Sequence, residues 1–164
     1  MSYIIRSIDG DDEPFLWEML YQALFVPPDT TPLPKEIIFQ PELAKYVQNW
    51  GLDADRGLIA VLEDERTLVG AVWLRIFKSS NPGYGYIDYR IPELSIAVLP
   101  KYRGRGIGTK LLTELFSQVR NQYSAISLSV SSNNPALRLY RRLGFEVINW
   151  QNNSLTMKKD LSSN

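Results

Sequence analysis

The chain has 164 residues, of which 45% are hydrophobic and 22% are charged, as is usual for one globular domain with a single buried core. Its 18 basic and 18 acidic residues cancel, so there is no overall positive field that would attract nucleic acid or an anionic membrane. Because the chain contains no cysteine and no histidine, disulfides, thiolate nucleophiles, histidine bases and cysteine zinc sites are excluded. We expect no metal, and proton transfer must rely on Asp, Glu, Tyr, Lys, a terminus or water.

The first residues of the chain do not resemble a secretion signal. Acidic residues directly follow a short apolar pair, which leaves no room for the apolar segment of a signal peptide. No apolar run approaches the length of a membrane span. We therefore expect a cytoplasmic protein with one domain over residues 1–164, without a membrane or nucleic-acid partner.

A strand and a helix are predicted at the start of the chain. Residues 3–8 alternate between apolar and polar side chains, which favours a short strand, and residues 9–25 favour a helix. Asp11 or Asp12 would cap this helix, with Pro14 in its first turn. Its apolar stripe consists of Phe15, Leu16, Met19, Leu20 and Ala23.

A loop separates this helix from a second helical segment. Residues 26–34 include four prolines, which predict an extended conformation. A linker between domains is the alternative, but the region before it is too short to form a domain. Residues 35–51 then predict a second or broken helix that ends near Gly51.

Apolar, β-branched runs in the middle of the chain predict a hairpin. Its strands would be residues 56–64 and 67–77, joined by a polar turn. Residues 78–85 are rich in Ser, Asn, Pro and Gly and predict a surface loop. Residues 86–100 predict another strand, with Pro92 near its start or at a bulge.

The last third of the chain also alternates between helix and strand. A broad apolar face at helical spacing predicts a long helix, formed by Ile107, Leu111, Leu112, Leu115, Phe116 and Val119. Residues 124–130 predict a strand, residues 134–144 a short helix, and residues 145–150 and 154–161 a final pair of strands. One sheet with helices packed on it, an α/β fold, is the economical architecture for this order.

The sequence YRGRGIG at residues 102–108 lies between a predicted strand and the long helix. A glycine-rich turn that leads into a helix exposes free backbone N–H groups at the positive end of the helix dipole, where phosphate binds readily. Arg103 and Arg105 add positive charge. The alternative is a tight turn with two solvated arginines.

Two familiar nucleotide-binding loops do not fit this turn. A dinucleotide fingerprint counted from Gly104 would need glycine at the position of Thr109. A P-loop would need lysine directly after its last glycine, but Gly108 is followed by Thr109 and only then by Lys110. A nucleotide-binding interaction domain is therefore the weaker hypothesis.

The turn instead resembles the acyl-CoA-binding signature of the GNAT acetyltransferase superfamily, Arg/Gln-x-x-Gly-x-Gly/Ala, with its six positions running from Arg103 to Gly108. A later stretch, NNPALRLYRRLGFE, is similar to a second family signature. Its matching residues are Asn133, Ala136, Tyr140, Gly144 and Phe145. The resemblance covers residues 56–160, the expected acetyl-CoA-binding core. Residues 1–55 match only in their strand-helix-helix order and would be the variable, acceptor-binding part.

This resemblance implies a GNAT-like acyl-CoA N-acyltransferase fold, a mixed, mostly antiparallel sheet of about six to seven strands flanked by about four helices. The strand ending at Val98 would splay from a parallel neighbour, with helices on both faces. Acetyl-CoA is implied as the acyl donor, with CoA as the product. The residues implied to bind it are Ile96, Ala97, Val98, Arg103, Gly104, Arg105, Gly106, Ile107, Gly108, Thr109, Asn133 and Tyr140.

Two residues are candidates for the proton transfers that acetylation of an amine requires. With no histidine or cysteine in the chain, a carboxylate is the natural base, and the resemblance points to Glu93. Strand alternation places Glu93 on a face with Ser95 and Ala97. The alternative to a base role is that Glu93 lies in solvent at the edge of a strand. The resemblance implies that Tyr140 donates a proton to the leaving thiolate. The alternative is that its ring only packs in the core.

An asparagine and several aromatic residues complete the candidate site. Asn133 would bind the pantetheine arm or cap the following helix, and its neighbour Asn134 could take either role. The acceptor would be a primary amine of a small molecule or peptide. Candidate residues for binding it are Trp17, Tyr21, Trp73, Tyr86 and Asp88. A non-catalytic acyl-CoA-binding module is the alternative function, and a homodimer remains open.

Overall fold

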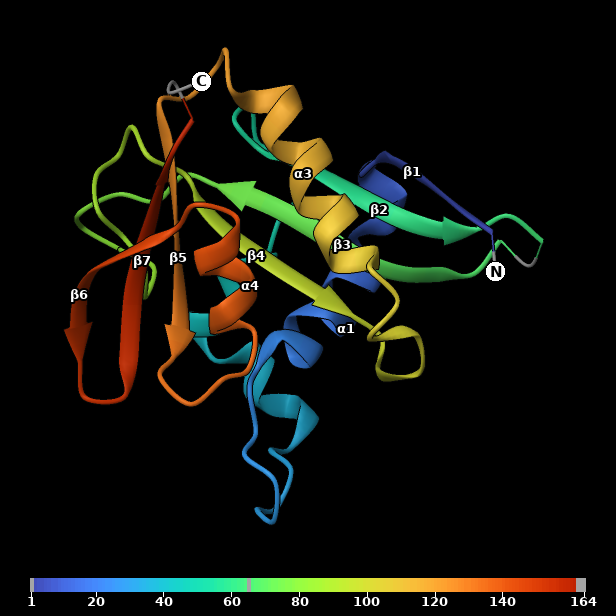
Figure 1. Ribbon diagram of the computed structural model, residues 1–164, viewed down its shortest axis with the longest axis horizontal. Coiled ribbons are helices and arrows are strands. Elements are labelled where there is room, and N and C mark those ends of the chain that lie inside the picture. The colour runs from blue at the N-terminus through green and yellow to red at the C-terminus, as the bar shows by residue number, and fades with distance from the viewer. Residues whose placement is uncertain (1, 65, 162–164) are drawn as a thin grey trace.

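The computed structural model describes residues 2–64 and 66–161 (Figure 1). Within these residues, one seven-stranded sheet has the order β1-β2-β3-β4-β5-β7-β6. The strands are β1 Tyr3–Ser7, β2 Arg56–Leu62, β3 Leu68–Arg75, β4 Glu93–Val98, β5 Ala125–Ser131, β6 Glu146–Gln151 and β7 Ser154–Asp160. The helices are α1 Glu13–Ala23, α2 Pro41–Ala44, α3 Ile107–Val119 and α4 Leu137–Arg142, and the 3₁₀ helices are η1 Gly10–Asp12, η2 Lys35–Phe39 and η3 Pro100–Tyr102.

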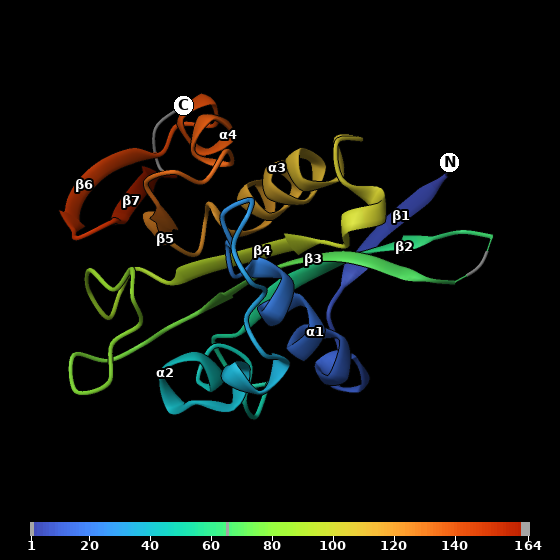
Figure 2. The same ribbon diagram turned by 90° about the horizontal axis from the view of Figure 1, so that it is seen from below.

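Helices cover both faces of the sheet, as predicted. Figure 2 shows α3 and α4 on one face and α1 and α2 on the other. The apolar side of α3 packs with inward-facing residues of the sheet into one core. A second core lies under α1, where Leu16, Met19 and Leu20 contact the opposite face of β2 and β3. The two inner strands β2 and β3 are therefore buried on both sides, which explains why their sequences are almost continuously apolar.

The β4 and β5 strands form the only parallel pair in the described sheet, and they separate almost at once. Their register contains a single residue pair, Glu93 with Ser127, whereas every other neighbouring pair is antiparallel and pairs over at least five residues. The Leu99 N–H donates to the Val69 carbonyl at 2.8 Å, so odd-numbered residues of β4 direct their backbone groups toward β3. The alternate residues, including Ile96, direct theirs toward the gap. The predicted splay is confirmed.

The β5 strand presents two chemically different faces. Ile126, Leu128 and Val130 lie in the core beneath α3 and α4. The alternate residues are Ser127, Ser129 and Ser131. Because strand side chains alternate, these serines lie on the same face of the sheet as Glu93, the face that α1 and α2 cover over the neighbouring strands.

Two local predictions are corrected by the structure, and a third is borne out. The η1 turn is capped by Asp9, whose carboxylate accepts from the Asp11 N–H at 2.9 Å. Asp12 occupies the predicted N-cap position of α1, but its carboxylate makes no cap hydrogen bond to that helix and accepts from Arg6 at 2.8 Å. The strand predicted over residues 86–100 begins only at Glu93, because residues 76–92 form a loop with successive turns. The helix predicted over residues 35–51 is broken into η2, α2 and turns, as the alternative allowed. Residue 65, in the turn predicted between the hairpin strands, lies outside the described residues.

A buried ion pair attaches the segment after α2 to the sheet. The Arg75 guanidinium contacts the Asp55 carboxylate at 2.9 and 3.1 Å, and both side chains are about 95% buried, with exposures of 5% and 3%. Arg75 also donates to the carbonyls of Lys45 and Gln48 at 2.9 and 2.7 Å. One side chain of β3 therefore fixes two turns of the amino-terminal part. No helix in the described part of the chain is long and apolar enough to cross a membrane.

We expect Arg75→Ala to lower the free energy of unfolding by about 3–5 kcal/mol, because it leaves the Asp55 carboxylate buried without its cation. Urea unfolding at neutral pH, followed by circular dichroism, measures this change. Lys110→Ala is the control, since it removes an exposed pair with Glu114 on α3, for which a loss of only about 0.5 kcal/mol is expected. Equal losses for the two variants would contradict the structural role given to Arg75.

Candidate active site

The glycine turn at the start of α3 has the backbone that an anion site requires. Gly104 and Gly106 have φ values of 76° and 81°, in the left-handed region that residues with a side chain rarely adopt. A Cβ atom at either position would meet nothing within 4 Å, so the glycines are needed for conformation and not for space. Gly106 is the N-cap of α3, and the first N–H groups of the helix follow it.

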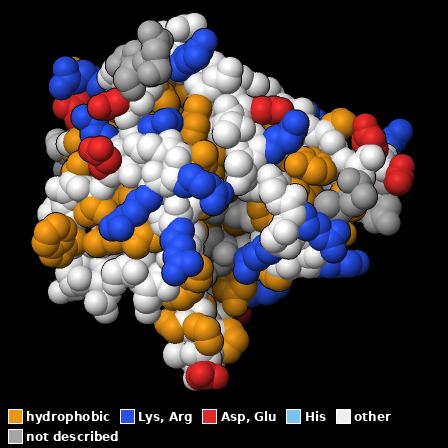
Figure 3. All heavy atoms as spheres, viewed as in Figure 1, with side chains coloured by type: hydrophobic (Ala, Val, Ile, Leu, Met, Phe, Trp, Pro, Cys, Tyr) orange, Lys and Arg blue, Asp and Glu red, His pale blue; other side chains and the backbone are white. Residues whose placement is uncertain are grey.

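The arginines of the turn are held by neighbouring groups. The Arg103 side chain donates to the Val98 carbonyl at 2.8 Å and to the Gln22 side chain at 3.3 Å, which links the turn to β4 and α1. The Arg105 guanidinium lies 5.9 Å from the centre of the Tyr102 ring. Figure 3 shows Lys and Arg side chains gathered around the turn and the neighbouring α4. The local charge is therefore positive, although the whole chain is neutral.

A cleft of about 840 Å³, here called the turn cleft, runs along this turn. Ten of the residues predicted to bind the cofactor line it: Ile96, Ala97, Val98, Arg103, Gly104, Gly106, Ile107, Gly108, Thr109 and Tyr140. Arg105 and Asn133 do not border it, and Asn133 is exposed. Asn134 lines the cleft instead, and its side chain accepts from the Ala136 N–H at 2.9 Å. The N-cap position of α4 is Ala136, so the predicted capping role of Asn133 is wrong.

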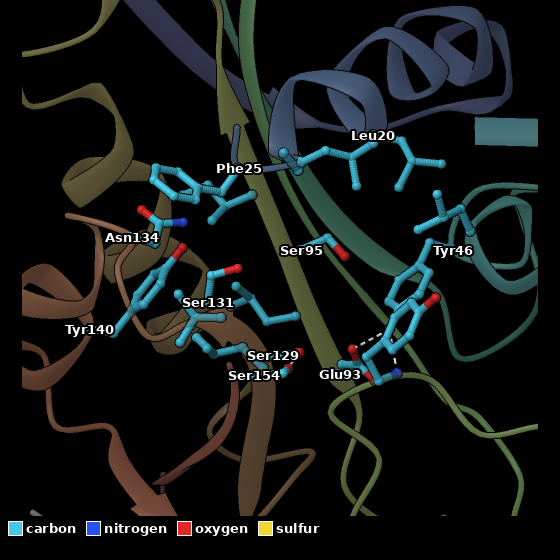
Figure 4. Close-up of a pocket in the computed structure, with 18 residues that line it drawn as sticks. Leu20, Phe25, Tyr46, Glu93, Ser95, Ser129, Ser131, Asn134, Tyr140 and Ser154 are labelled. Atoms are coloured by element: carbon cyan, nitrogen blue, oxygen red, sulfur yellow. Dashed lines mark hydrogen bonds between the residues drawn. The ribbon is translucent and has the colours of Figure 1, made fainter. Parts of the chain in front are cut away.

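A second cavity of about 250 Å³, here called the Glu93 cavity, lies in the gap between β4 and β5 (Figure 4). It shares six residues with the turn cleft: Ala23, Leu24, Phe25, Ile96, Asn134 and Tyr140. Glu93 enters the cavity from the face of the sheet covered by α1, whereas Tyr140 belongs to the core on the opposite face. The splay therefore brings the two residues to one cavity from opposite sides of the sheet.

Tyr140 lies where the two cavities join. Its ring packs edge-on against Phe145 with ring centres 5.9 Å apart, and the residue is 9% exposed. Figure 4 shows its hydroxyl turned into the cavity beside the Asn134 amide. Burial raises the pKa of Tyr140 to about 12, so the hydroxyl stays protonated at neutral pH. Tyr140 is therefore packed in the core, and it also lines both cavities.

Glu93 is buried, with an exposure of 3%, so the alternative of a solvated position at a strand edge is wrong. Its Oε2 accepts from the Tyr46 hydroxyl, while Oε1 is buried and has no hydrogen-bond partner. Burial raises the pKa of Glu93 to about 7, although the Tyr46 hydroxyl, the Gly85 amide and the Lys45 charge each oppose the rise. A carboxyl group with this pKa can take up and release a proton at neutral pH.

The loop of residues 76–92 encloses the carboxylate. The Tyr84 N–H donates to the Tyr46 hydroxyl at 2.8 Å, and the Lys45 ammonium contacts Asn81 and Pro82. A Cβ atom at Gly83 would lie 2.2 Å from Glu93 Oε1 and 2.8 Å from the Tyr46 hydroxyl. A side chain at position 83 would therefore require the carboxylate and the Tyr46 hydroxyl to shift.

Tyr46 was not predicted as a site residue. It is 6% exposed, and its backbone carbonyl accepts from the Trp73 indole at 2.9 Å. Burial and the neighbouring Glu93 carboxylate raise its pKa, so its hydroxyl remains a donor to that carboxylate. No motif marks Tyr46, since its partner is 47 residues away in the chain. The alternation of serine along β5 is the one local signal that could have indicated a polar cavity wall.

The predicted acceptor-binding residues lie mostly outside the two cavities. Trp73 is 1% exposed and belongs to the core, so it is not available to a ligand. Trp17 packs on Phe39 with ring centres 5.3 Å apart, and its indole donates to Glu13. Tyr86 and Asp88 border neither cavity, and Asp88 is paired with Arg90 at 2.9 Å. Tyr21 lines the turn cleft, but its hydroxyl donates to the Leu33 carbonyl at 2.6 Å.

Metal ligands do not gather in the described ranges, residues 2–64 and 66–161. No group of three or more His, Cys, Asp or Glu side chains there could hold a metal ion. The groups available at the two cavities are one buried carboxyl group, buried tyrosine hydroxyls and the glycine turn at the start of α3.

Known proteins resemble this chain in sequence and in structure. An N-alpha-acetyltransferase of Sulfurisphaera tokodaii is 45% identical over 58 residues, which are 34% of this chain and 35% of that protein. This chain thus spans about a third of the length of that sequence relative. The PaiA N-acetyltransferase of Thermoplasma acidophilum, solved in complex with coenzyme A, has a TM-score of 0.68 at 20% identity and covers 98% of this chain and 99% of its own. A ribosomal-protein-alanine N-acetyltransferase of Brucella melitensis has a TM-score of 0.65 at 25% identity, with 96% of this chain and 99% of its own covered.

The family itself is identified by a match over most of the chain. The sequence model of the acetyltransferase (GNAT) family matches residues 17–145, which include β4, the glycine turn, α3 and Tyr140. The solved structures share the whole fold, which agrees with the predicted GNAT-like sheet and helices. The chain belongs to the acetyltransferase (GNAT) family.

Proposed function

We propose that this protein is an acetyl-CoA-dependent N-acetyltransferase that transfers an acetyl group to a primary amine by direct attack. The observation that carries the proposal is the junction of two cavities at Tyr140, with Glu93 at the far side of the smaller one. The names of the relatives, which include an N-alpha-acetyltransferase and a structure with coenzyme A, support the same activity.

The turn cleft fits the donor. The N–H groups at the start of α3 and the positive charge around Gly104 and Gly106 suit a pyrophosphate. The backbone groups of β4 at Ile96 suit the amides of a pantetheine arm, because the splay leaves them without a strand partner. When bound there, acetyl-CoA supplies the activated acetyl thioester.

The Glu93 cavity supplies the proton transfers. Glu93 accepts a proton from the acceptor ammonium, and the neutral nitrogen then bonds to the thioester carbon and loses its second proton to solvent. Tyr140 donates its hydroxyl proton to the sulfur as the carbon–sulfur bond breaks. The products are an N-acetyl compound and CoA, and the proton taken by Glu93 replaces that of Tyr140 through solvent. Tyr46 acts through Glu93 and is a positioning residue.

The acceptor side involves residues 1–55, in keeping with their expected role as the variable part. Leu20 and Leu43 line the Glu93 cavity with Tyr46, and the loop of residues 76–92 contributes Tyr84. We place the acetyl-CoA-binding core in residues 56–160 of one domain, of which residue 65 lies outside the described chain. A non-catalytic acyl-CoA-binding module would have no need for a buried carboxyl group with an unpaired oxygen.

Gly106→Ala is expected to weaken acetyl-CoA binding by about tenfold, because a Cβ atom in the left-handed region costs about 1–2 kcal/mol and shifts the turn. Isothermal titration calorimetry with acetyl-CoA measures the change. Gly10→Ala is the matched control, since a Cβ atom there also meets nothing and the residue is not in the left-handed region. Unchanged affinity in Gly106→Ala would remove the turn from the binding site.

Tyr140→Phe is expected to lower kcat by about ten- to a thousandfold, because the leaving sulfur loses its proton donor. The KM for acetyl-CoA should stay within about twofold, since the ring and its packing are kept. Steady-state kinetics with a saturating amine provide the test. Tyr123→Phe, whose hydroxyl bonds to Ala54 away from both cavities, is the control and should keep wild-type kcat. Wild-type turnover in Tyr140→Phe would eliminate the donor role.

The pH dependence of kcat should show the titration of Glu93. The pKa of Glu93 is about 7, so its base form predominates above about pH 7, and kcat is expected to rise as the pH increases through this value. Tyr46→Phe removes a hydrogen bond that lowers the pKa of Glu93, so the rise should move to higher pH. Its loss of activity should therefore be larger at pH 6 than at pH 9, measured with one amine at saturation.

Glu93→Gln is the companion variant for this profile. It should lack the rise near pH 7 and recover activity at high pH, where the amine is already neutral. A Tyr46→Phe profile parallel to that of the wild type at all pH values would show that Tyr46 only supports the fold.

A further inference from the structure

The Glu93 cavity has one charged residue among the eighteen that line it (Figure 4). That residue is Glu93 itself, and the others are apolar, hydroxyl or amide side chains. The two cations nearest to the carboxylate are held elsewhere. Lys45 contacts Asn81 and Pro82, and Arg75, which faces Glu93 across the β3–β4 ladder, is paired with Asp55. An acceptor in this cavity therefore meets a lining whose one charged side chain is negative.

The Glu93 carboxylate is only partly satisfied by its neighbours in the chain. Oε2 is bound by Tyr46, and the unpartnered Oε1 is buried. A buried charge is stable only when it is paired and hydrogen-bonded, so an ammonium group that reaches the carboxylate from the cavity suits it. A second ammonium on the same acceptor would find no second carboxylate in the cavity lining.

The same charge opposes acceptors that carry a carboxylate close to their amine. In a free amino acid the two groups are separated by one carbon atom, so both would enter a cavity of about 250 Å³. The acceptor carboxylate would then lie beside Glu93 in a site without a lining cation, and like charges placed together in a desolvated site are strongly disfavoured.

The uncharged polar groups of the lining match an amide. Ser95 and Ser131 contribute hydroxyls, and Ser129 and Ser154 contribute a pair whose oxygens are 3.0 Å apart. The Asn134 carbonyl oxygen is used within the chain, which leaves its amide hydrogens to donate. These donors and acceptors can satisfy an amide carbonyl or N–H next to the reacting amine, which an alkyl chain could not use.

We propose that the acceptor is a primary amine flanked by an uncharged amide, as at the first residue of a peptide, and that free amino acids and polyamines are rejected. This inference rests on the proposed acetyltransferase function and deepens it. The acid–base chemistry agrees, because such an amine has a pKa of about 8, closer to that of Glu93 than the value of about 10.4 for a lysine side chain.

The test compares matched amines with the wild-type protein and saturating acetyl-CoA. Alaninamide, a short peptide amide beginning with alanine, free alanine, n-propylamine and spermidine serve as acceptors. Released CoA can be followed with a thiol reagent, because the chain contains no cysteine that would react. We expect kcat/KM for alaninamide and the peptide to exceed that for free alanine and spermidine by about a hundredfold or more.

Two results of this comparison would overturn the inference. If free alanine or spermidine reacts as well as alaninamide, or if n-propylamine is the best acceptor, the stated class is wrong while acetyl transfer stands. If acetyl-CoA binds but no acceptor releases CoA above the rate of hydrolysis, the proposed function fails and the inference fails with it.

A binding measurement separates charge repulsion from a structural effect. Calorimetric titration of the CoA-bound protein with alaninamide and alanine should show a large preference for alaninamide in the wild type. In Glu93→Gln the preference should shrink to within a few fold, since the like charge is gone. An undiminished preference in this variant would show that Glu93 does not select the acceptor.

Discussion

The separation of β4 from β5 is the feature on which the rest of the site depends. The two strands share one residue pair, and past it the backbone groups of β4 on that side have no strand partner. Unpaired buried backbone groups are unfavourable, so such a gap persists only where the surroundings hold it open. Here α3 and α4 pack over one face, and at the closed end Gly85 lies against the backbone of Leu128 and Ser129. Both cavities open from this gap.

Burial of Glu93 lowers the stability of the fold at any pH where the carboxyl group is ionised. Its pKa is about 7 in the folded chain and 4.5 in the unfolded reference, so the folded state binds the proton more tightly. The associated stability is present below about pH 4.5 and is lost as the pH rises through about 7, a change of about 3 kcal/mol. The buried carboxylate with a free oxygen is thus retained despite its effect on folding, which is typical of residues kept for function.

The sequence was most informative where function depends on local structure. The glycine turn, the apolar face of α3 and the position of Tyr140 depend on residues close together in the chain, so their patterns could be read directly. The start of β4 was placed too early because residues 86–92 alternate like a strand, although turns around Asp88 interrupt them. Asn133 and Asn134 are adjacent, and only the path of the chain decides which one enters the cavity. Tyr46 could not be found, because its role depends on a long-range contact.

The proposed donor and acceptor halves of the site are consequently built in different ways. The turn cleft takes most of its functional groups from one continuous stretch, residues 96–109, so a short motif is enough to specify it. The Glu93 cavity is assembled from α1, the segment around Tyr46, the loop of residues 76–92, β4 and β5. Its walls can change residue by residue without moving the glycine turn. Acceptor choice can therefore vary while the donor site stays the same, and the charge of Glu93 is the one fixed element that both the proton transfer and the selection of the amine would use.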